Sequence, residues 1–373
     1  MKIKILESFQ TENSYYHDNL AVGWNEHTTK PINDIDNFHF FKFLTIDKDT
    51  NIEGRNIFPI FISAHTKQIT KTDIGPILRY IKNNVDLFIS KNLIPVFWDP
   101  LEGNVTIAEE IDKIADEFNS AFPIYYISAD FKLTYRKNKF TFVYNDQWLH
   151  HIPPRNDIID FIPERTYINC NRVARYHRCM LMDEIINRSM LTQGWNTWAN
   201  TYGAFEEYKN DFPDTQIDQK KYDILDVKDI TQANPTHMIP IRHCQSSTIY
   251  VNTETHYKNE NLFISEKTYK PISIGMPFMS LGNPGTLDYL RLLGFETFSE
   301  WIDESYDLDL PLQKRVETLV ENLVYLNGFS VKGRKKLRKS MSEVCRHNLE
   351  VYKRLQRRNT FVTNLKRIEK GML

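Results

Sequence analysis

The first half of the chain alternates short apolar runs, rich in Ile, Phe and Val, with segments whose apolar residues recur at helical spacing. Short continuous apolar runs are typical of strands buried on both faces, and recurrence every three or four residues is typical of helices. The pattern therefore predicts strands and helices in alternation, as in parallel sheets. We expect strands at 2–6, 57–63, 94–98 and 122–128, and helices at 74–90 and 106–120, the second opened by a capping box from Thr106 to Glu109.

The same alternation returns in the second half. Glycine commonly follows the last residue of a helix, where the chain turns through a left-handed conformation, so Gly275 and Gly294 are the expected helix ends. A basic hairpin is expected at 132–144, and 200–228 is polar enough to be a loop insertion with little core. The expected strands are 166–170, 247–253 and 277–281, and the expected helices are 173–191, 266–274 and 286–293.

Together these elements predict an α/β fold of two Rossmann-like domains that face each other across a cleft. Pro153, Pro154 and Pro163 mark the boundary between the halves, because prolines are frequent in segments that link ordered units. From Gly333 onward, apolar residues at helical spacing predict a C-terminal basic helix with one side able to dock. We expect an acceptor-side domain at 1–163, a nucleotide-sugar domain at 164–330 and a basic helical tail at 331–373.

Composition narrows the class of protein. The 373 residues are 41% hydrophobic, yet no apolar run approaches the roughly 18 residues that cross a bilayer, so no membrane span is expected. Aromatic residues make up 13% of the chain, which provides more burial than a disordered chain carries. The four cysteines form no CxxC pair, and the first residues lack a secretory leader pattern. We therefore expect a cytoplasmic protein with reduced thiols.

The charge of the chain is divided unevenly. Residues 332–373 contain 14 Lys or Arg against three Glu, although the whole chain has a net charge of −1. Such an asymmetry indicates an anionic partner, a nucleic acid or a membrane surface. Alternatively, the basic helices neutralise the acidic stretch 296–309 of the same chain. Both interpretations stay open at this stage.

The segment from Phe263 to Pro271 carries the clearest chemistry. Ser265 follows an extended stretch and precedes a helical pattern, so it is the expected N-cap. A helix N-terminus suits a phosphate or diphosphate, more so with Lys267 and Lys270 beside it. The carboxylate of Glu266 can accept the hydrogen bonds of a ribose diol. The residues alone also fit an ordinary capped helix.

A resemblance favours the nucleotide interpretation. The residues Ile264, Ser265, Glu266 and Lys267, followed by Gly275, Pro277, Leu281 and Gly282, resemble the donor-site segment of GT-B glycosyltransferases of the α-1,3-fucosyltransferase type. That pattern has Thr where Ser265 stands, then an aromatic and a basic residue, matched by Tyr269 and Lys270. The continuation to Asp307 is similar to glycosyltransferase-like proteins of tailed phages and marine bacteria, which implies host cytoplasm if the source is viral.

A second basic patch lies where the strand at 166–170 passes into a helix. Carboxyl ends of strands are where open α/β sheets bind ligands, and arginine binds phosphate through two parallel hydrogen bonds. Asn169 or Asn171 is the expected cap, and either Arg172 or Arg178 is expected on the donor diphosphate, as the phage-type resemblance also implies. Solvated helix charge is the other interpretation. His177 is expected to pack, and Glu254, at the end of another strand, is assigned to the donor side.

A transferase that inverts configuration needs a base for the acceptor hydroxyl. Asp99 and Glu102 follow the expected strand 94–98 and are the catalytic candidates, although a polar turn explains them equally. The strings Asp34-Ile-Asp36 and Asp307-Leu-Asp309 are interpreted as solvated loops, so no metal site is expected.

The sequence and its resemblance thus predict a metal-independent GT-B glycosyltransferase that moves a sugar from a nucleotide-sugar to a hydroxyl acceptor, without a cofactor. The acceptor is a glycan or, in a phage context, a modified DNA base approached through the basic tail. The alternative is a catalytically silent module that binds a nucleotide or a glycan on the same scaffold.

Overall fold

The computed structural model divides into two compact units, each described by itself. Unit 1 is Met1–Gln147 with Asn359–Leu373, and unit 2 is Trp148–Arg358. The structure describes residues 29–31, 41–46, 56–62, 81–90, 92–99, 105–117, 123–146, 148–150, 152–155, 161–171, 174–198, 205–215, 217, 239–259, 261–358, 364, 367–368 and 370–372. The expected strand at 2–6 lies outside these residues.

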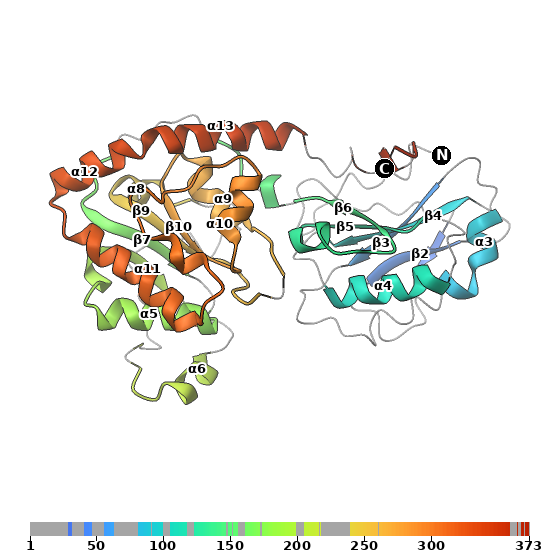
Figure 1. Ribbon diagram of the computed structural model, residues 1–373, viewed down its shortest axis with the longest axis horizontal. Coiled ribbons are helices and arrows are strands. Elements are labelled where there is room, and N and C mark those ends of the chain that lie inside the picture. The colour runs from blue at the N-terminus through green and yellow to red at the C-terminus, as the bar shows by residue number, and fades with distance from the viewer. Residues whose placement is uncertain are drawn as a thin grey trace. The chain divides into compact units, whose positions relative to one another are not determined.

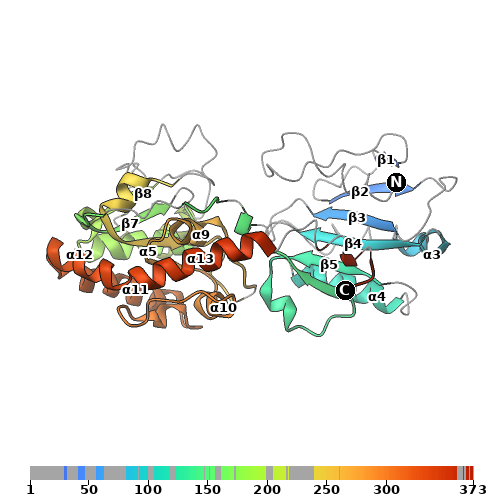
Figure 2. The same cartoon turned by 90° about the horizontal axis from the view of Figure 1, so that it is seen from above.

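Unit 1 contains a six-stranded sheet in which the strand order follows the chain, from β1 to β6. The last four strands are parallel, and β1 and β2 add antiparallel pairs at one edge. Figure 2 shows β2 to β5 succeeding one another in one layer. The strands are β1 (Thr29–Pro31), β2 (Phe41–Ile46), β3 (Asn56–Ile62), β4 (Leu93–Asp99), β5 (Tyr125–Ser128) and β6 (Thr141–Tyr144), and the helices are α3 (Val85–Ser90) and α4 (Val105–Glu117).

Two expectations for unit 1 need correction. The stretch at 132–144 is not a hairpin: a short 3-10 helix, Phe131–Thr134, leads to β6, which pairs parallel to β5. The reason is local, because Asp130 caps the 3-10 helix by accepting the N–H of Lys132 at 3.1 Å and turns the chain back for a crossover. Thr106 lies inside the first turn of α4 and does not precede it.

Unit 2 is built on a four-stranded sheet, with all strands parallel in the order β10-β9-β7-β8. The predicted α/β class with parallel sheets is confirmed. The strands are β7 (Arg165–Asn171), β8 (Gly194–Trp198), β9 (Ser247–Thr253) and β10 (Phe278–Leu281). The helices are α5 (Tyr176–Asn187), α6 (Phe205–Asp211), α8 (Ile241–Gln245), α9 (Glu266–Ser273), α10 (Thr286–Leu292), α11 (Leu312–Asn327), α12 (Val331–Ser340) and α13 (Ser342–Arg358).

The direction in which the chain proceeds through this sheet reverses between β7 and β9. From β7 it crosses through α5 to β8, and from β9 it crosses through α9 to β10 on the other side. Right-handed crossovers in opposite directions place their helices on opposite faces of a sheet. Accordingly, α5 packs against α11, and α9 packs against α13 (Figure 1). The carboxyl ends of β7 and β9 form the switch point where open α/β sheets bind ligands.

The local signals in unit 2 located several of its elements closely, although β8, α6 and α8 were not expected. The strand expected at 247–253 has the bounds of β9, and α9 begins directly after Ser265, whose hydroxyl accepts the N–H of Lys267. Gly275 and Gly294 have φ values of +64° and +94°, the left-handed conformation that their helix-ending role requires. The polar span 200–228 does contain core, because α6 lies in it and buries Phe205 and Tyr208.

The basic tail forms two helices, α12 and α13, where the pattern predicted one. In α12 the inward side chains are Arg334 and Arg338, which are 8% and 3% exposed, while Leu337 is half-buried. Arg334 donates to the carbonyls of 163, 164 and 329, and Arg338 donates to those of 244 and 247. Arginine is buried here because backbone carbonyls accept its hydrogen bonds, a relation that hydropathy periodicity does not detect.

A third buried arginine joins the loops at the carboxyl edge of the unit 2 sheet. Arg315 of α11 is 1% exposed and donates to three carbonyls: Tyr306 at 2.7 Å, Tyr257 at 2.9 Å and Gly282 at 2.7 Å. Tyr257 follows β9, Gly282 follows β10, and Tyr306 lies in a later 3-10 helix. One side chain therefore holds three loops in fixed relation.

We expect Arg315→Met to lower the free energy of unfolding by about 3 kcal/mol or more, because it leaves three buried carbonyls without donors. Urea unfolding followed by circular dichroism measures the change. The neighbouring Lys314 is 58% exposed at its side chain, so Lys314→Met is the matched control and should stay within about 0.5 kcal/mol of the wild type. Equal effects of the two substitutions would contradict the role given to Arg315.

Candidate functional site

The two segments that the sequence singled out meet at the switch point between β7 and β9. Arg178, in the first turn of α5, donates through Nη2 to the carbonyls of Thr253 and Glu254, each at 3.2 Å. The carbonyl of Glu254 also lies 2.9 Å from Nε2 of His177. Thr253 donates its hydroxyl to Oδ1 of Asn171, at the end of β7. The strand end after β9 is thus tied to the basic patch that follows β7.

Glu254 is the centre of this arrangement. Its side chain is fully buried, and one carboxylate oxygen accepts the Ser265 N–H at 3.2 Å and the Thr268 hydroxyl at 2.6 Å. The other oxygen accepts the Ser265 hydroxyl. A Cβ on Gly282 would lie 3.1 Å from Cγ of Glu254, so glycine at this position lets the two approach closely.

The hydrogen bonds that Glu254 accepts at the start of α9 change how this helix N-terminus is interpreted. The partial positive charge at the start of α9 already faces the carboxylate of Glu254, an internal anion in the position where we expected a diphosphate. Ser265 is 1% exposed and engaged on both sides. In this structure both residues shape α9, and direct donor contact by either stays a prediction.

Glu266 presents an acceptor that the described residues leave without a hydrogen bond. The residue is 6% exposed, and Oε1 lies 3.1 Å from Nζ of Lys267. Oε2 is buried and has no hydrogen-bond partner among the described residues. Burial by itself raises the pKa of Glu266, but the charges of Lys267 and Lys270 outweigh it and hold that pKa below its ordinary value. The site therefore contains an ionised carboxylate with one buried acceptor atom that no described residue satisfies.

The other α9 candidates fall into different environments. Lys267 is a quarter exposed at its side chain, and Nζ also contacts the Ser265 hydroxyl at 3.1 Å. Lys270 is more enclosed, and burial lowers its pKa despite the opposing effect of Glu266. Tyr269 is fully buried and stacks on Tyr352 of α13, with ring centroids 5.4 Å apart. Its visible contact is packing, so a donor role for Tyr269 has no support in the geometry.

The second patch is more internal than its sequence indicated. Arg178 is 4% exposed, and burial lowers its pKa to about 10. Asn171 is 2% exposed and donates to Asn169 Oδ1 at 3.0 Å. Both hold the switch point together. Arg172, the other diphosphate candidate, lies outside the described residues. His177 is buried with its ring 4.6 Å from that of Tyr257, in agreement with the packing role expected for it.

The catalytic candidates belong to unit 1. Asp99 ends β4, is 2% exposed and accepts the Tyr126 hydroxyl at 3.4 Å. Glu102 lies outside the described residues. Two carboxylates that the sequence reasoning missed, Asp130 and Asp146, follow β5 and β6 and are also buried. Their signal was available: acidic residues just past successive parallel strands share one edge of the sheet.

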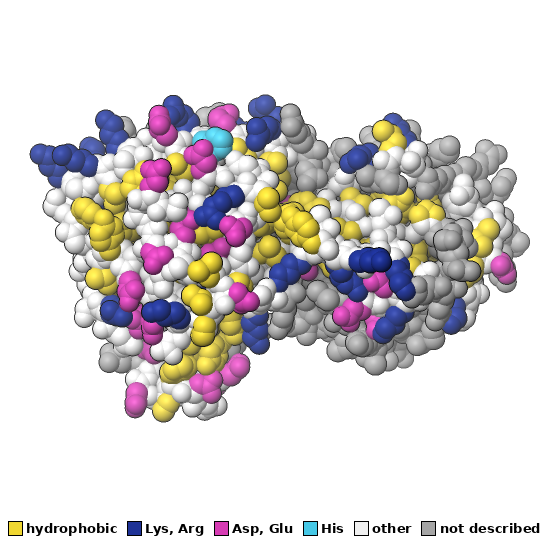
Figure 3. All heavy atoms as spheres, viewed as in Figure 1, with side chains coloured by type: hydrophobic (Ala, Val, Ile, Leu, Met, Phe, Trp, Pro, Cys, Tyr) yellow, Lys and Arg dark blue, Asp and Glu magenta, His cyan; other side chains and the backbone are white. Residues whose placement is uncertain are grey.

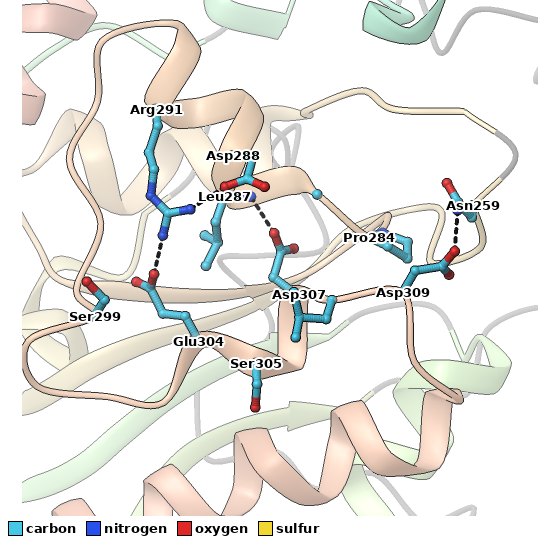
Figure 4. Close-up of a pocket in the computed structure, with 12 residues that line it drawn as sticks. Asn259, Pro284, Leu287, Asp288, Arg291, Ser299, Glu304, Ser305, Asp307 and Asp309 are labelled. Carbon is cyan, nitrogen blue, oxygen red and sulfur yellow. Dashed lines mark hydrogen bonds and ion pairs between the residues drawn. The ribbon is translucent and has the colours of Figure 1, made fainter.

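An open pocket of about 570 Å³ lies in unit 2 beside the start of α10 (Figure 4). On one wall Arg291 donates to Asp288 and Glu304, and on another Asn259 donates to Asp309. None of the predicted site residues lines it. Within the described ranges, no group of His, Cys, Asp and Glu side chains is arranged to hold a metal ion.

Asp307 also lines this pocket and corrects an expectation, because it is not solvated. It is 6% exposed and accepts the N–H of Leu287 at 2.7 Å, which makes it a cap for α10. Burial raises the pKa of Asp307 to about 7. Asp309, the second aspartate of the sequence Asp307-Leu-Asp309, accepts a hydrogen bond from the side-chain amide of Asn259.

Comparisons with known proteins give little beyond the fold. No family model and no curated protein matches the chain. A solved GtfA/B complex aligns with 84% of this chain and 62% of its own, at 7% identity and a TM-score of 0.35. The pneumococcal O-GlcNAc transferase GtfA, solved with UDP and GlcNAc, aligns with 75% of this chain and 55% of its own, at 9% identity and a TM-score of 0.38. This chain thus spans less than two thirds of either neighbour, and at such TM-scores we base no argument on them.

We expect Asp307→Asn to gain stability relative to the wild type as the pH rises. In the folded protein Asp307 has a pKa of about 7, against an ordinary value of 3.8. Proton binding at Asp307 therefore stabilises the folded state fully below about pH 4, and this contribution is lost as the pH rises to about 7. Asparagine does not ionise, so the variant avoids that loss. Urea unfolding at about pH 4.5 and about pH 8 should show the difference in unfolding free energy shifting by about 2 kcal/mol.

The control for this experiment is Asp288→Asn, since Asp288 lines the same pocket but its side chain is 78% exposed. Its difference from the wild type should change by less than about 0.5 kcal/mol over the same interval. A pH-independent effect of Asp307→Asn would contradict the burial argument.

Proposed function

We propose that the protein is a glycosyltransferase that binds a nucleotide-sugar at the carboxyl edge of the unit 2 sheet. The observation that carries the proposal is the unused, buried acceptor of Glu266 beside the partly exposed Lys267. A ribose diol supplies hydroxyl donors for Oε2, and a diphosphate supplies negative charge for Lys267. The resemblance of 264–307 to fucosyltransferase-type donor segments supports the same assignment.

In this proposal the surrounding residues position the two that touch the ligand. Glu254 and Ser265 fix the first turn of α9, and Lys267 together with Lys270 lowers the pKa of Glu266 and keeps it ionised. Arg178 and Asn171 hold the end of β9 to the end of β7. Lys267, with Arg172 if its predicted role holds, supplies the positive charge that stabilises a departing diphosphate, so no metal ion is required.

The acceptor side is assigned to unit 1, where Asp99 or Glu102 would take the acceptor proton in an inverting reaction. The position of Asp99 at the carboxyl edge of its sheet supports this role. Its burial favours the alternative, a silent module that binds a nucleotide or glycan without transferring sugar. We keep the cytoplasm as the expected compartment, which suits the four free cysteines.

Isothermal titration with UDP and GDP tests the donor site. We expect the wild type to bind one of them, and Glu266→Gln to weaken binding about tenfold or more, because it loses hydrogen bonds to a charged acceptor. Lys267→Met should weaken binding by a similar factor. Glu321→Gln, at an exposed carboxylate of α11, is the matched control and should bind as the wild type does. The donor assignment fails if neither nucleotide binds, or if Glu266→Gln binds as tightly as the wild type while remaining folded.

Slow hydrolysis of a nucleotide-sugar then separates the enzyme from the silent module. We expect release of free sugar by the wild type, and release at a much lower rate by Asp99→Asn if Asp99 is the base. Nucleotide binding with no release from UDP- or GDP-sugars would favour the binding module.

A further inference from the structure

Helix α12 presents a row of four lysines to solvent. Lys332, Lys335, Lys336 and Lys339 follow the spacing i, i+3, i+4 and i+7, so they share one face over about 10 Å of helix. All four are exposed, and none forms an ion pair or hydrogen bond with another described residue. Dark blue side chains gather over this helix in Figure 3. We call these four residues the lysine row.

The lysine row is unfavourable for the helix itself. Like charges at i+3 and i+4 repel, and the row contains two pairs of each kind. The helix contains no acidic residue that could relieve this repulsion. It stays in place because Arg334 and Arg338 anchor its opposite face to backbone carbonyls. Arg334 and Arg338 thus hold α12 to unit 2, and the four exposed lysines are available to bind a partner outside the protein.

An aromatic pair adjoins one end of the row. Tyr325, 57% exposed, and Phe329 lie edge to face with ring centroids 5.3 Å apart. A Cβ on Gly333 would come within 3.2 Å of Cβ of Phe329, so the pair reaches α12 beside the row. Exposed aromatic rings next to cationic side chains are the combination on which unpaired bases stack.

The residues of α11 and α13 on either side of the lysine row favour a partner no wider than one helix. The following helix, α13, pairs Glu343 with Arg346 and Glu350 with Lys353, at 3.3 and 2.7 Å. The preceding helix, α11, carries the exposed acid Glu321. A flat anionic bilayer would bring the exposed acids Glu321, Glu343 and Glu350 to its surface as well, together with the remaining basic residues of α13. A single strand of nucleic acid can follow a row one helix wide, so charge complementarity is better for the strand.

We propose that α12 and the Tyr325–Phe329 pair bind a single-stranded nucleic acid, with the lysine row on its phosphates and Tyr325 stacked on a base. Lysine binds phosphate as a point charge and makes no base-specific contact, so binding here does not depend on the base sequence of the strand. The inference goes beyond the proposed function and does not depend on the donor site. If both hold, the strand is the molecule that brings the acceptor.

Fluorescence anisotropy with a labelled oligonucleotide of about 15 nucleotides tests the proposal in the full-length chain. We expect Lys335→Ala/Lys336→Ala to weaken binding about tenfold at low salt and to reduce the slope of log K against log salt by about 1.4, roughly 0.7 for each lost phosphate contact. The matched control, Lys209→Ala/Lys258→Ala, removes two exposed lysines elsewhere in unit 2 and should change neither quantity.

The aromatic contact has its own readout. Tyr325→Ala should weaken binding about fivefold or more with an unchanged salt slope, and Tyr325→Phe should bind as the wild type does, because stacking needs only the ring. Tighter binding to a duplex of the same length, or to phosphatidylserine vesicles, would overturn the assignment to a single strand. Unchanged binding by the lysine variant would overturn it altogether.

Cross-controls separate this inference from the donor site. Glu266→Gln should leave oligonucleotide binding intact, and Lys335→Ala/Lys336→Ala should leave UDP or GDP binding intact. Each pairing lets one proposal fail while the other stands.

Discussion

The buried carboxylate of Glu254 is the interaction on which the unit 2 site depends. It joins the end of β9 to the N-cap of α9, Ser265, which lies 11 positions further along the chain, and its backbone carbonyl accepts a hydrogen bond from Arg178 of α5. An uncompensated carboxylate in this position would be strongly unfavourable, so the three donors of Ser265 and Thr268 are a condition for the fold. Because these hydrogen bonds fix the start of α9, they also fix the positions of Glu266 and Lys267, its first two residues.

Elsewhere in unit 2, buried arginines supply the hydrogen-bond donors that buried backbone carbonyls need. Loops at strand ends expose carbonyls that no ladder satisfies, and a guanidinium has enough donors to satisfy several at once. Arg315 does this at the carboxyl edge, and Arg334 and Arg338 do it beneath α12. The charge stays inside because oxygen dipoles surround it, although burial lowers the pKa of Arg338 to about 10. These hydrogen bonds explain how unit 2 keeps three arginines buried.

Local signals in the sequence were sufficient for most elements and for part of the site. Ser265 as a cap and the bounds of β9 follow from residue types a few positions apart. The environment of Glu266 did not follow, because its burial and its contact with Lys267 depend on packing around α9 that residue types alone do not reveal. The burial of Arg334 and Arg338 in α12 did not follow either, because hydropathy marks only apolar residues, whereas carbonyl acceptors distant in sequence draw these arginines inward. Asp130 follows a strand that the sequence did predict, whereas recognising Asp146 needed the parallel pairing of β6, which was expected as a hairpin.

The arginine that joins three loops has a consequence for the thermodynamics of recognition. Since Arg315 already fixes the backbone after β9, after β10 and in the 3-10 helix, a molecule arriving at this edge meets a surface ordered during folding. Little conformational entropy remains to be lost on association, so the free energy of each new contact is retained as affinity. The rigidity of the edge is thus a form of preorganisation, established by a side chain that need not touch the ligand.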